Sequence, residues 1–146
     1  MKEIYKDWVI VFLLLFGVAG FAEAREIAVI GNSQNGTASL SQRDVKSIFL
    51  GDKEFFGSVK VLLVDQAAGS RIRAGFMGKA LDSDPETFDK YWLNKQFQDG
   101  GTPPKKFGSS AEVIDEVGRN SGAIGYVYKD EVAGKKSVKI LFVIGE

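Results

Sequence analysis

Apolar residues along the chain gather in short runs and in helical stripes, and the most informative pattern lies at residues 61–81. Four apolar residues at 61–64 are followed by Asp65, a turn of small residues, and a stretch at 70–81 with apolar positions at helical spacing. This pattern predicts a buried strand, a tight turn and a helix that begins at Ser70. Such a helix start offers free backbone N–H groups and the positive end of the helix dipole, so it can hold an anion.

The rest of the chain alternates between strands and helices. Apolar runs predict strands at 26–31, 59–64, 123–128 and 138–144, and apolar stripes with capping residues predict helices at 40–51, 84–97 and 109–118. This alternation predicts an α/β fold whose sheet contains parallel crossovers covered by helices. Ligands of such sheets lie at the carboxyl ends of strands, beside helix N-termini, which is where Ser70 falls.

Local signals support two of these helices. Ser41 and Asp44 fit a capping box, and Gly51 fits the left-handed position that follows a helix. In the helix that begins at Asp84 and Pro85, a group of aromatic residues is expected in the core: Phe88, Tyr91, Trp92 and Phe97.

The N-terminal residues have the features of a targeting segment. Residues 8–21 form an uncharged run of 14 residues, and an A-x-A cleavage site follows at 22–24. A spanning helix needs about 20 apolar residues, so we predict a signal peptide at 1–24, a mature domain at 25–146 and a periplasmic location. The alternative is an uncleaved anchor, because acidic residues nearly balance the basic ones before the apolar run.

Charge and composition exclude several functions. The mature domain would keep 17 of the 19 basic and 16 of the 19 acidic residues, a balance that gives no support to nucleic acid or a membrane surface as partner. The sequence has no Cys and no His, which removes the usual zinc sites, Ser–His and Cys–His pairs and His general bases. We therefore expect no metal, no cofactor and no enzymatic activity.

The turn after Asp65 is the strongest candidate site, and it has two interpretations. Arg71 and Arg73 lie in the first helical turn, where a cation opposes the dipole by roughly 0.3–1 kcal/mol. Either an anion offsets them, or nearby acids such as Asp65 do. Asp65 itself would repel an anion. Ser70 is either an anion ligand or a simple N-cap that stabilises the helix by about 1 kcal/mol.

A polar loop at 32–39 is the second candidate. It contains Ser33 and several other hydroxyl and amide groups. One interpretation is plain turn chemistry. The other is a second ring of donors near Ser70.

Five stretches, in this order, carry a resemblance to a known family: SIFLGDKEFFG (47–57), SRIRAGF (70–76), YWLNKQF (91–97), TPPK (102–105) and SGAIGYV (121–127). The chain resembles phosphate ABC transporter substrate-binding proteins and, more narrowly, their short single-lobe members with a PBP-like domain. The resemblance implies one lobe of a type II periplasmic binding fold, with a mixed, mostly parallel sheet flanked by helices.

The resemblance also places the site. The phosphate turn of full-length members reads approximately Arg-x-Asp-Gly-Ser-Gly-Thr. On residues 66–72 only Gly69 and Ser70 match, while Gln66 and Ala68 stand where the arginine and the aspartate would be. The expected ligand-binding residues are Gly69, Ser70, Arg71, Arg73 and Ser33.

Two functional hypotheses follow from the resemblance. In the first, the chain is an exported, non-catalytic solute-binding-like protein that binds phosphate or another small oxyanion as an accessory of an ABC uptake system. In the second, it is a cell-envelope protein-interaction or signalling module that uses the lobe without a small ligand. A homodimer in which two lobes rebuild a clamp is a third arrangement.

Overall fold

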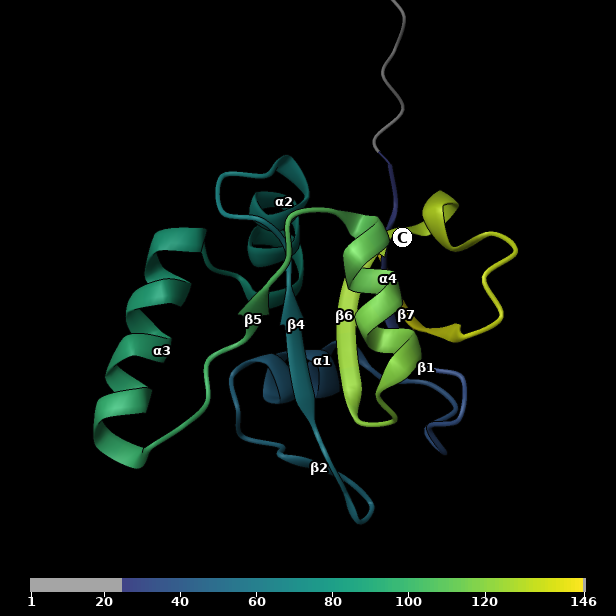
Figure 1. Ribbon diagram of the computed structural model, residues 1–146. Helices are drawn as coiled ribbons and strands as arrows, with labels where there is room; N and C mark the ends of the chain where they lie inside the picture. Colours follow the sequence, from purple (N-terminus) through teal and green to yellow (C-terminus); the bar gives the residue numbers. More distant parts are fainter. Residues whose placement is uncertain (1–24, 146) are drawn as a thin grey trace, which may run out of the picture.

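The computed structural model of the protein describes residues 25–145, so the predicted signal peptide at 1–24 lies outside the described residues. A five-stranded sheet carries helices on both faces, and a small two-stranded sheet lies below it (Figure 1). The helices are α1 (Gln42–Phe49), α2 (Arg71–Leu81), α3 (Pro85–Asp99), α4 (Ser110–Arg119) and the 3₁₀ helix η1 (Lys129–Val132). The strands are β1 (Ile27–Asn32), β2 (Phe55–Phe56), β3 (Val59–Lys60), β4 (Leu62–Asp65), β5 (Lys105–Lys106), β6 (Ala123–Tyr128) and β7 (Val138–Ile144).

The strand order of the main sheet is β5-β4-β6-β1-β7. β4 runs parallel to β5 and to β6, whereas β1 runs antiparallel to both β6 and β7. Four strands therefore point one way and β1 points the other way. This confirms the expected mixed, mostly parallel sheet flanked by helices.

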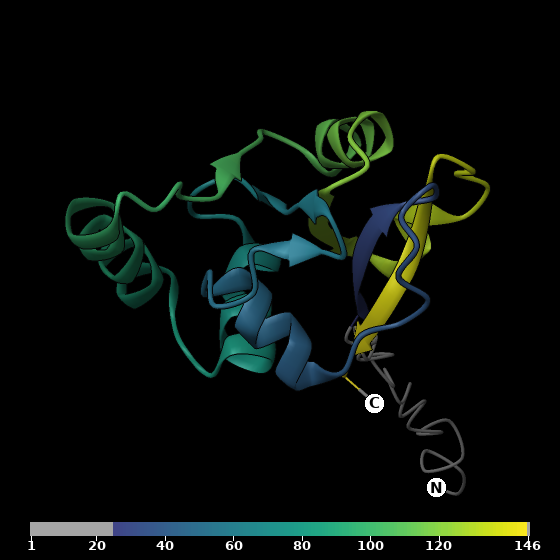
Figure 2. The ribbon, with the colours of Figure 1, turned by 90° about the horizontal axis from the view of Figure 1, so that it is seen from below.

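The sheet is buried on both faces, and this explains the continuous apolar run at the start of β1. Ile27 and Val29 face the larger core cluster, which lies beneath α1, α2 and α3, while Ala28 and Ile30 face a second cluster beneath α4. The view in Figure 2 shows α4 on one side of the sheet and α1 with α2 on the other. A strand between two helical layers has no solvent face, so alternation with polar residues is lost.

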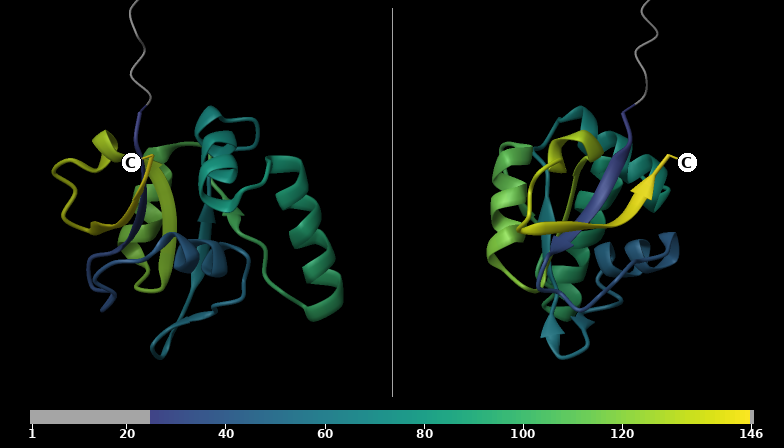
Figure 3. Two further views of the ribbon diagram at one scale, coloured as in Figure 1. Left: turned by 180° about the vertical axis from the view of Figure 1, so that it is seen from behind. Right: turned by 90° about the vertical axis from the view of Figure 1, so that its right-hand side faces the viewer.

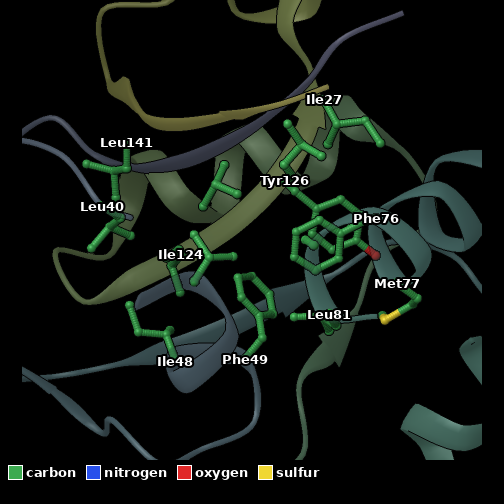
Figure 4. Close-up of a cluster of buried hydrophobic side chains, with 14 of the residues drawn as sticks. Ile27, Leu40, Ile48, Phe49, Phe76, Met77, Leu81, Ile124, Tyr126 and Leu141 are labelled. Atoms are coloured by element: carbon green, nitrogen blue, oxygen red, sulfur yellow. The ribbon is translucent and has the colours of Figure 1, made fainter. Parts of the chain in front are cut away.

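Aromatic rings at the centre of the larger cluster fix the position of α2 (Figure 4). The ring of Phe76 stacks on that of Tyr126, with centroids 3.8 Å apart, and meets the ring of Phe49 edge-on at 4.8 Å. These three side chains come from α2, β6 and α1. Because all three are fully buried, they fix the middle of α2 against β6 and α1.

The local capping predictions are confirmed, but one predicted strand is divided. The Ser41–Asp44 capping box is formed, and Gly51 has a φ of +76°. The prediction of a single strand at 59–64 is wrong, because this segment is divided between two sheets: β3 belongs to the small sheet and β4 to the main sheet. The Val61 N–H donates to Glu54 in the small hairpin, and the next N–H, that of Leu62, donates to Gly122 in the main sheet.

The aromatic residues of α3 do not all enter the core. Phe88 and Trp92 are buried and Tyr91 is partly buried, but the side chain of Phe97 is 81% exposed, so its expected place in the core is wrong. Figure 3 shows the reason: α3 lies at the edge of the molecule, away from the sheet. No helix among residues 25–145 is long and apolar enough to cross a membrane.

Candidate functional site

The turn between β4 and α2 has the form that the sequence predicts. The Ser70 N–H donates to the carbonyl of Ala67 at 3.1 Å, which closes a β-turn, and Gly69 within it has a φ of +77°. Only glycine takes this left-handed conformation without strain. The turn brings the chain from the end of the sheet directly into the first turn of α2.

Ser70 occupies the N-cap position of α2, as the sequence predicts, but its side chain does not make the capping hydrogen bond that would stabilise the helix. Its backbone is extended, as in other N-caps, but its side chain accepts no N–H from the helix. The Oγ atom is buried and has no hydrogen-bond partner among the described residues. By contrast, Ser41, Asp84 and Ser109 each accept a backbone N–H at the start of their own helices. The start of α2 therefore keeps its backbone donors and an unused hydroxyl.

Arg73 is buried in an ion-pair network instead of facing the turn. Its Nε donates to Asp65 Oδ2 at 2.9 Å, and its Nη2 donates to Asp89 Oδ1 at 2.7 Å. Burial acts to lower the pKa of Arg73, but its hydrogen bond to the Asp89 carboxylate and the negative charge of Asp65 outweigh burial and raise that pKa. Of the two explanations for an arginine in the first turn, the structure supports compensation by nearby acids.

The network extends through both carboxylates. Asp65 accepts a hydrogen bond from the Tyr126 hydroxyl and another from the Gln66 N–H, and Asp89 also pairs with Lys106 at 3.2 Å. Burial, followed by the charge of Asp65, strongly raises the pKa of the Tyr126 hydroxyl, so this group stays protonated and donates. The negative charges of Asp65 and Asp89 therefore balance the positive charges of Arg73 and Lys106 within the network.

The other predicted site residues do not all gather at the turn. Arg71 is exposed and makes no ion pair with any described residue, and it follows Gly69 and Ser70 directly. Ser33, however, follows the end of β1, which runs opposite to β4. It therefore lies at the other end of the sheet, where its N–H donates to the carbonyl of Ser137. The prediction that Ser33 contributes to a second ring of donors near Ser70 is wrong.

A cavity of about 660 Å³ lies beside the turn. Gly69 and Arg73 contribute to one wall, and Phe88, Asp89 and Trp92 of α3 contribute to the other. Ser70 and Arg71 do not line it. The candidate anion site at the start of α2 is thus next to this partly apolar cavity and not inside it.

Three members of this site are not predicted by the sequence reasoning. Asp89 and Lys106 complete the network around Arg73, and Gln66 anchors the turn because its Nε2 donates to the Tyr126 carbonyl at 2.9 Å and to Ser110 Oγ at 3.1 Å. Asp89 lies 16 residues from Arg73 and has no local signal that marks it. Within residues 25–145, no group of three or more acidic, His or Cys side chains is arranged to hold a metal ion.

The fold defines the class of protein to which the chain is similar. Its fold is similar to that of substrate-binding proteins of phosphate ABC transporters. Among the solved structures is a protein from Clostridium perfringens assigned as a phosphate ABC transporter substrate-binding protein and solved with bound phosphate. It matches with a TM-score of 0.65 and 19% identity, over 80% of this chain and 45% of that one.

Two further solved structures agree. An ABC-type phosphate transport receptor from Vibrio cholerae matches with a TM-score of 0.61 and 18% identity, over 80% of this chain and 46% of the receptor. PstS from Borrelia burgdorferi matches with a TM-score of 0.59 and 15% identity, over 80% of this chain and 47% of PstS. The chain thus spans less than half the length of each. No family model and no curated protein sequence matches it.

Proposed function

We propose that the protein is an exported, non-catalytic solute-binding-like protein that holds phosphate or another small oxyanion at the start of α2, as an accessory of an ABC uptake system. The observation that carries this proposal is the Ser70 hydroxyl. It is buried, it has no hydrogen-bond partner in the part of the chain that the structure describes, and it lies at a helix start without a side-chain capping bond. The anion would receive hydrogen bonds from this hydroxyl and from the backbone N–H groups around Gly69 and Arg71.

The charges around the turn support an anion. The first turn of α2 contains no acidic residue, and the exposed Arg71 adds a positive charge to the helix dipole. The objection that Asp65 would repel an anion loses its force, because Arg73 neutralises Asp65 from 2.9 Å away. Arg73 thereby acts as a positioning residue and not as a ligand.

The expected binding is weak. One lobe leaves its anion open to water on one side, so water competes with each donor. The chain also spans less than half of the phosphate transporter proteins whose fold it shares. We therefore expect dissociation constants in the millimolar range.

Calorimetry and thermal-shift measurements with phosphate, sulfate and acetate test the proposal. Phosphate should release heat and raise the melting temperature, and both effects should be reduced in Ser70→Ala and Arg71→Ala. Arg43→Ala is the matched control, since Arg43 is an exposed arginine on α1, away from the turn. Absence of any response at millimolar anion would contradict the proposal. Mass spectrometry of the secreted chain tests export, with Arg25 as the expected first residue.

A second function, a protein-interaction module of the cell envelope, is favoured by a different observation. Leu93 and Phe97 lie one turn apart on α3 and are 53% and 81% exposed, so α3 presents an apolar ridge to solvent. A partner protein, or a second copy of the chain, could cover this ridge. Light scattering of the purified protein and of a Leu93→Ser, Phe97→Ser variant tests the second copy: a dimer lost in the variant supports it, and a monomer in both cases rules it out.

A further inference from the structure

A second cavity, of about 270 Å³, lies away from the turn at the other end of α3. Its walls come from the end of α1, the β2–β3 hairpin, the start of β4, the end of α3 and the loop that leads to β5. The lining includes the apolar side chains of Ile48, Val61, Leu63 and Trp92. Leu62 also lines it and is 39% exposed, so part of this apolar surface is open to solvent.

Lysines from four different segments contribute to the lining of this cavity. They are Lys53, Lys60, Lys95 and Lys105. Two acidic residues, Glu54 and Asp99, also line the cavity, which leaves an excess of two positive charges. None of these six groups makes an ion pair with another described residue, whereas Lys90, Lys106 and Lys129 elsewhere on the surface are each paired.

We propose that this cavity binds a small amphipathic organic anion, that is, an apolar body bearing a carboxylate or a phosphate. The apolar lining would take the body out of water, which is favourable in proportion to the apolar area buried. The lysines would receive the anionic group. Because a lysine is a flexible point charge without the fork geometry of arginine, the site accepts a carboxylate or a phosphate alike.

The dimensions and the lining restrict the ligand further. A volume of about 270 Å³ is just below the usual range of ligand pockets, which suits a small molecule, the size of a single aromatic ring with its acidic group. Inorganic phosphate is not the expected ligand, because it has no apolar part to cover Val61, Leu63 and Trp92. A neutral aromatic compound lacks the charge that the lysines require. This ligand class therefore differs from the bare oxyanion proposed for the α2 turn.

Amide NMR titrations of the protein test the proposal with four probes: benzoate, phenyl phosphate, benzyl alcohol and inorganic phosphate. Benzoate and phenyl phosphate should shift the signals of Gly101 and Lys105 and of the Trp92 indole N–H, whereas the other two compounds should not. Shifts from both charged aromatic probes support the shared chemistry, and a shift from one alone identifies the acidic group. An equal response to benzyl alcohol would overturn the role of the lysines.

Charge-reversal variants locate the site. Lys60→Glu combined with Lys105→Glu should weaken the binding of phenyl phosphate by about tenfold or more, because two attractive charges become repulsive. Lys136→Glu, on an exposed loop outside the cavity, is the matched control and should leave the binding unchanged. Loss of binding in Ser70→Ala, with no effect of the lysine pair, would overturn the proposal and assign the probe to the α2 turn.

Discussion

The carboxylate of Asp65 and the guanidinium of Arg73 lie 2.9 Å apart, and both side chains are only 2% exposed. This pair joins the end of β4 to the first turn of α2, beside the candidate site. It removes one positive charge from the candidate site and neutralises one negative charge there. The pair therefore leaves the helix dipole, Ser70 and Arg71 to decide the chemistry of the turn.

Substitution of Arg73 should strongly lower the free energy of unfolding, whereas substitution of Arg71 should leave it almost unchanged. Arg73→Ala would leave Asp65 buried without its partner, so we expect a loss of about 3–5 kcal/mol in the free energy of unfolding. Arg71→Ala changes an exposed side chain and should alter that free energy by no more than about 0.5 kcal/mol. Urea denaturation of the two variants gives both values. Similar losses in the two variants would show that the buried pair has no special role.

Stability should depend on pH through Asp89. Burial acts to raise the pKa of Asp89, but hydrogen bonds from Arg73 and Lys106, with their charges, outweigh it and hold that pKa below its ordinary value. A lowered pKa adds stability above the unfolded value of about 4, and this stability is lost as the pH falls through the folded value. The free energy of unfolding should therefore drop below about pH 4.

The variant Asp89→Asn isolates this effect. Its free energy of unfolding should be lower than that of the original protein at neutral pH, and the difference should shrink as the pH falls below about 4. Asp115→Asn, which removes an exposed carboxylate from α4, controls for the change in total charge. A difference that is constant from neutral pH to pH about 3 would exclude Asp89 as a source of the dependence.

Close packing of the β3–β4 segment against β6 should make Gly122 intolerant of substitution. A Cβ atom at Gly122 would lie 2.0 Å from the backbone oxygen of Lys60, and the Gly122 carbonyl accepts the Leu62 N–H that holds β4 in register. Gly122→Ala should lower the free energy of unfolding by about 1–3 kcal/mol. Gly36→Ala is the matched control, because no atom lies within 4 Å of the added methyl group. A thermal melt in which both variants behave alike would contradict the steric explanation.

Two phenylalanines of α3 should differ sharply in their contribution to stability. Phe88 is buried and lies in the larger core cluster, so Phe88→Ala should cost about 3–5 kcal/mol. Phe97 faces solvent, and Phe97→Ala should change the free energy of unfolding by no more than about 0.5 kcal/mol. Equal costs, measured by chemical denaturation, would mean that Phe97 is covered by a second molecule in solution.

Much of the fold follows from signals that lie close together in the sequence. The Ser41–Asp44 capping box spans three residues, and the apolar stripe of α2 spans three helical turns. Such signals depend on backbone hydrogen bonds and on helical periodicity, which a few neighbouring residues decide. The strand–turn–helix around Gly69, the other main helices and the two-layered burial of the sheet could be predicted for this reason.

The candidate site could be predicted only in part. Gly69, Ser70 and Arg71 are adjacent in the chain, so the turn necessarily brings them together. Ser33 was expected near them but lies at the other end of the sheet, because β1 runs antiparallel to β6. The direction of an isolated apolar strand cannot be inferred from its composition, since both directions bury the same side chains.

The sequence by itself therefore determined most of the elements of this protein and the form of the turn at residues 66–71, between a strand and a helix start. The tertiary structure alone decided which groups act there. Arg73 turns inward to Asp65 and Asp89, Tyr126 approaches from a strand 61 residues away, and the Ser70 hydroxyl finds no partner within residues 25–145. The physical reason is that a hydrogen bond between distant segments depends on strand direction, register and packing. These are settled only when the whole core is assembled.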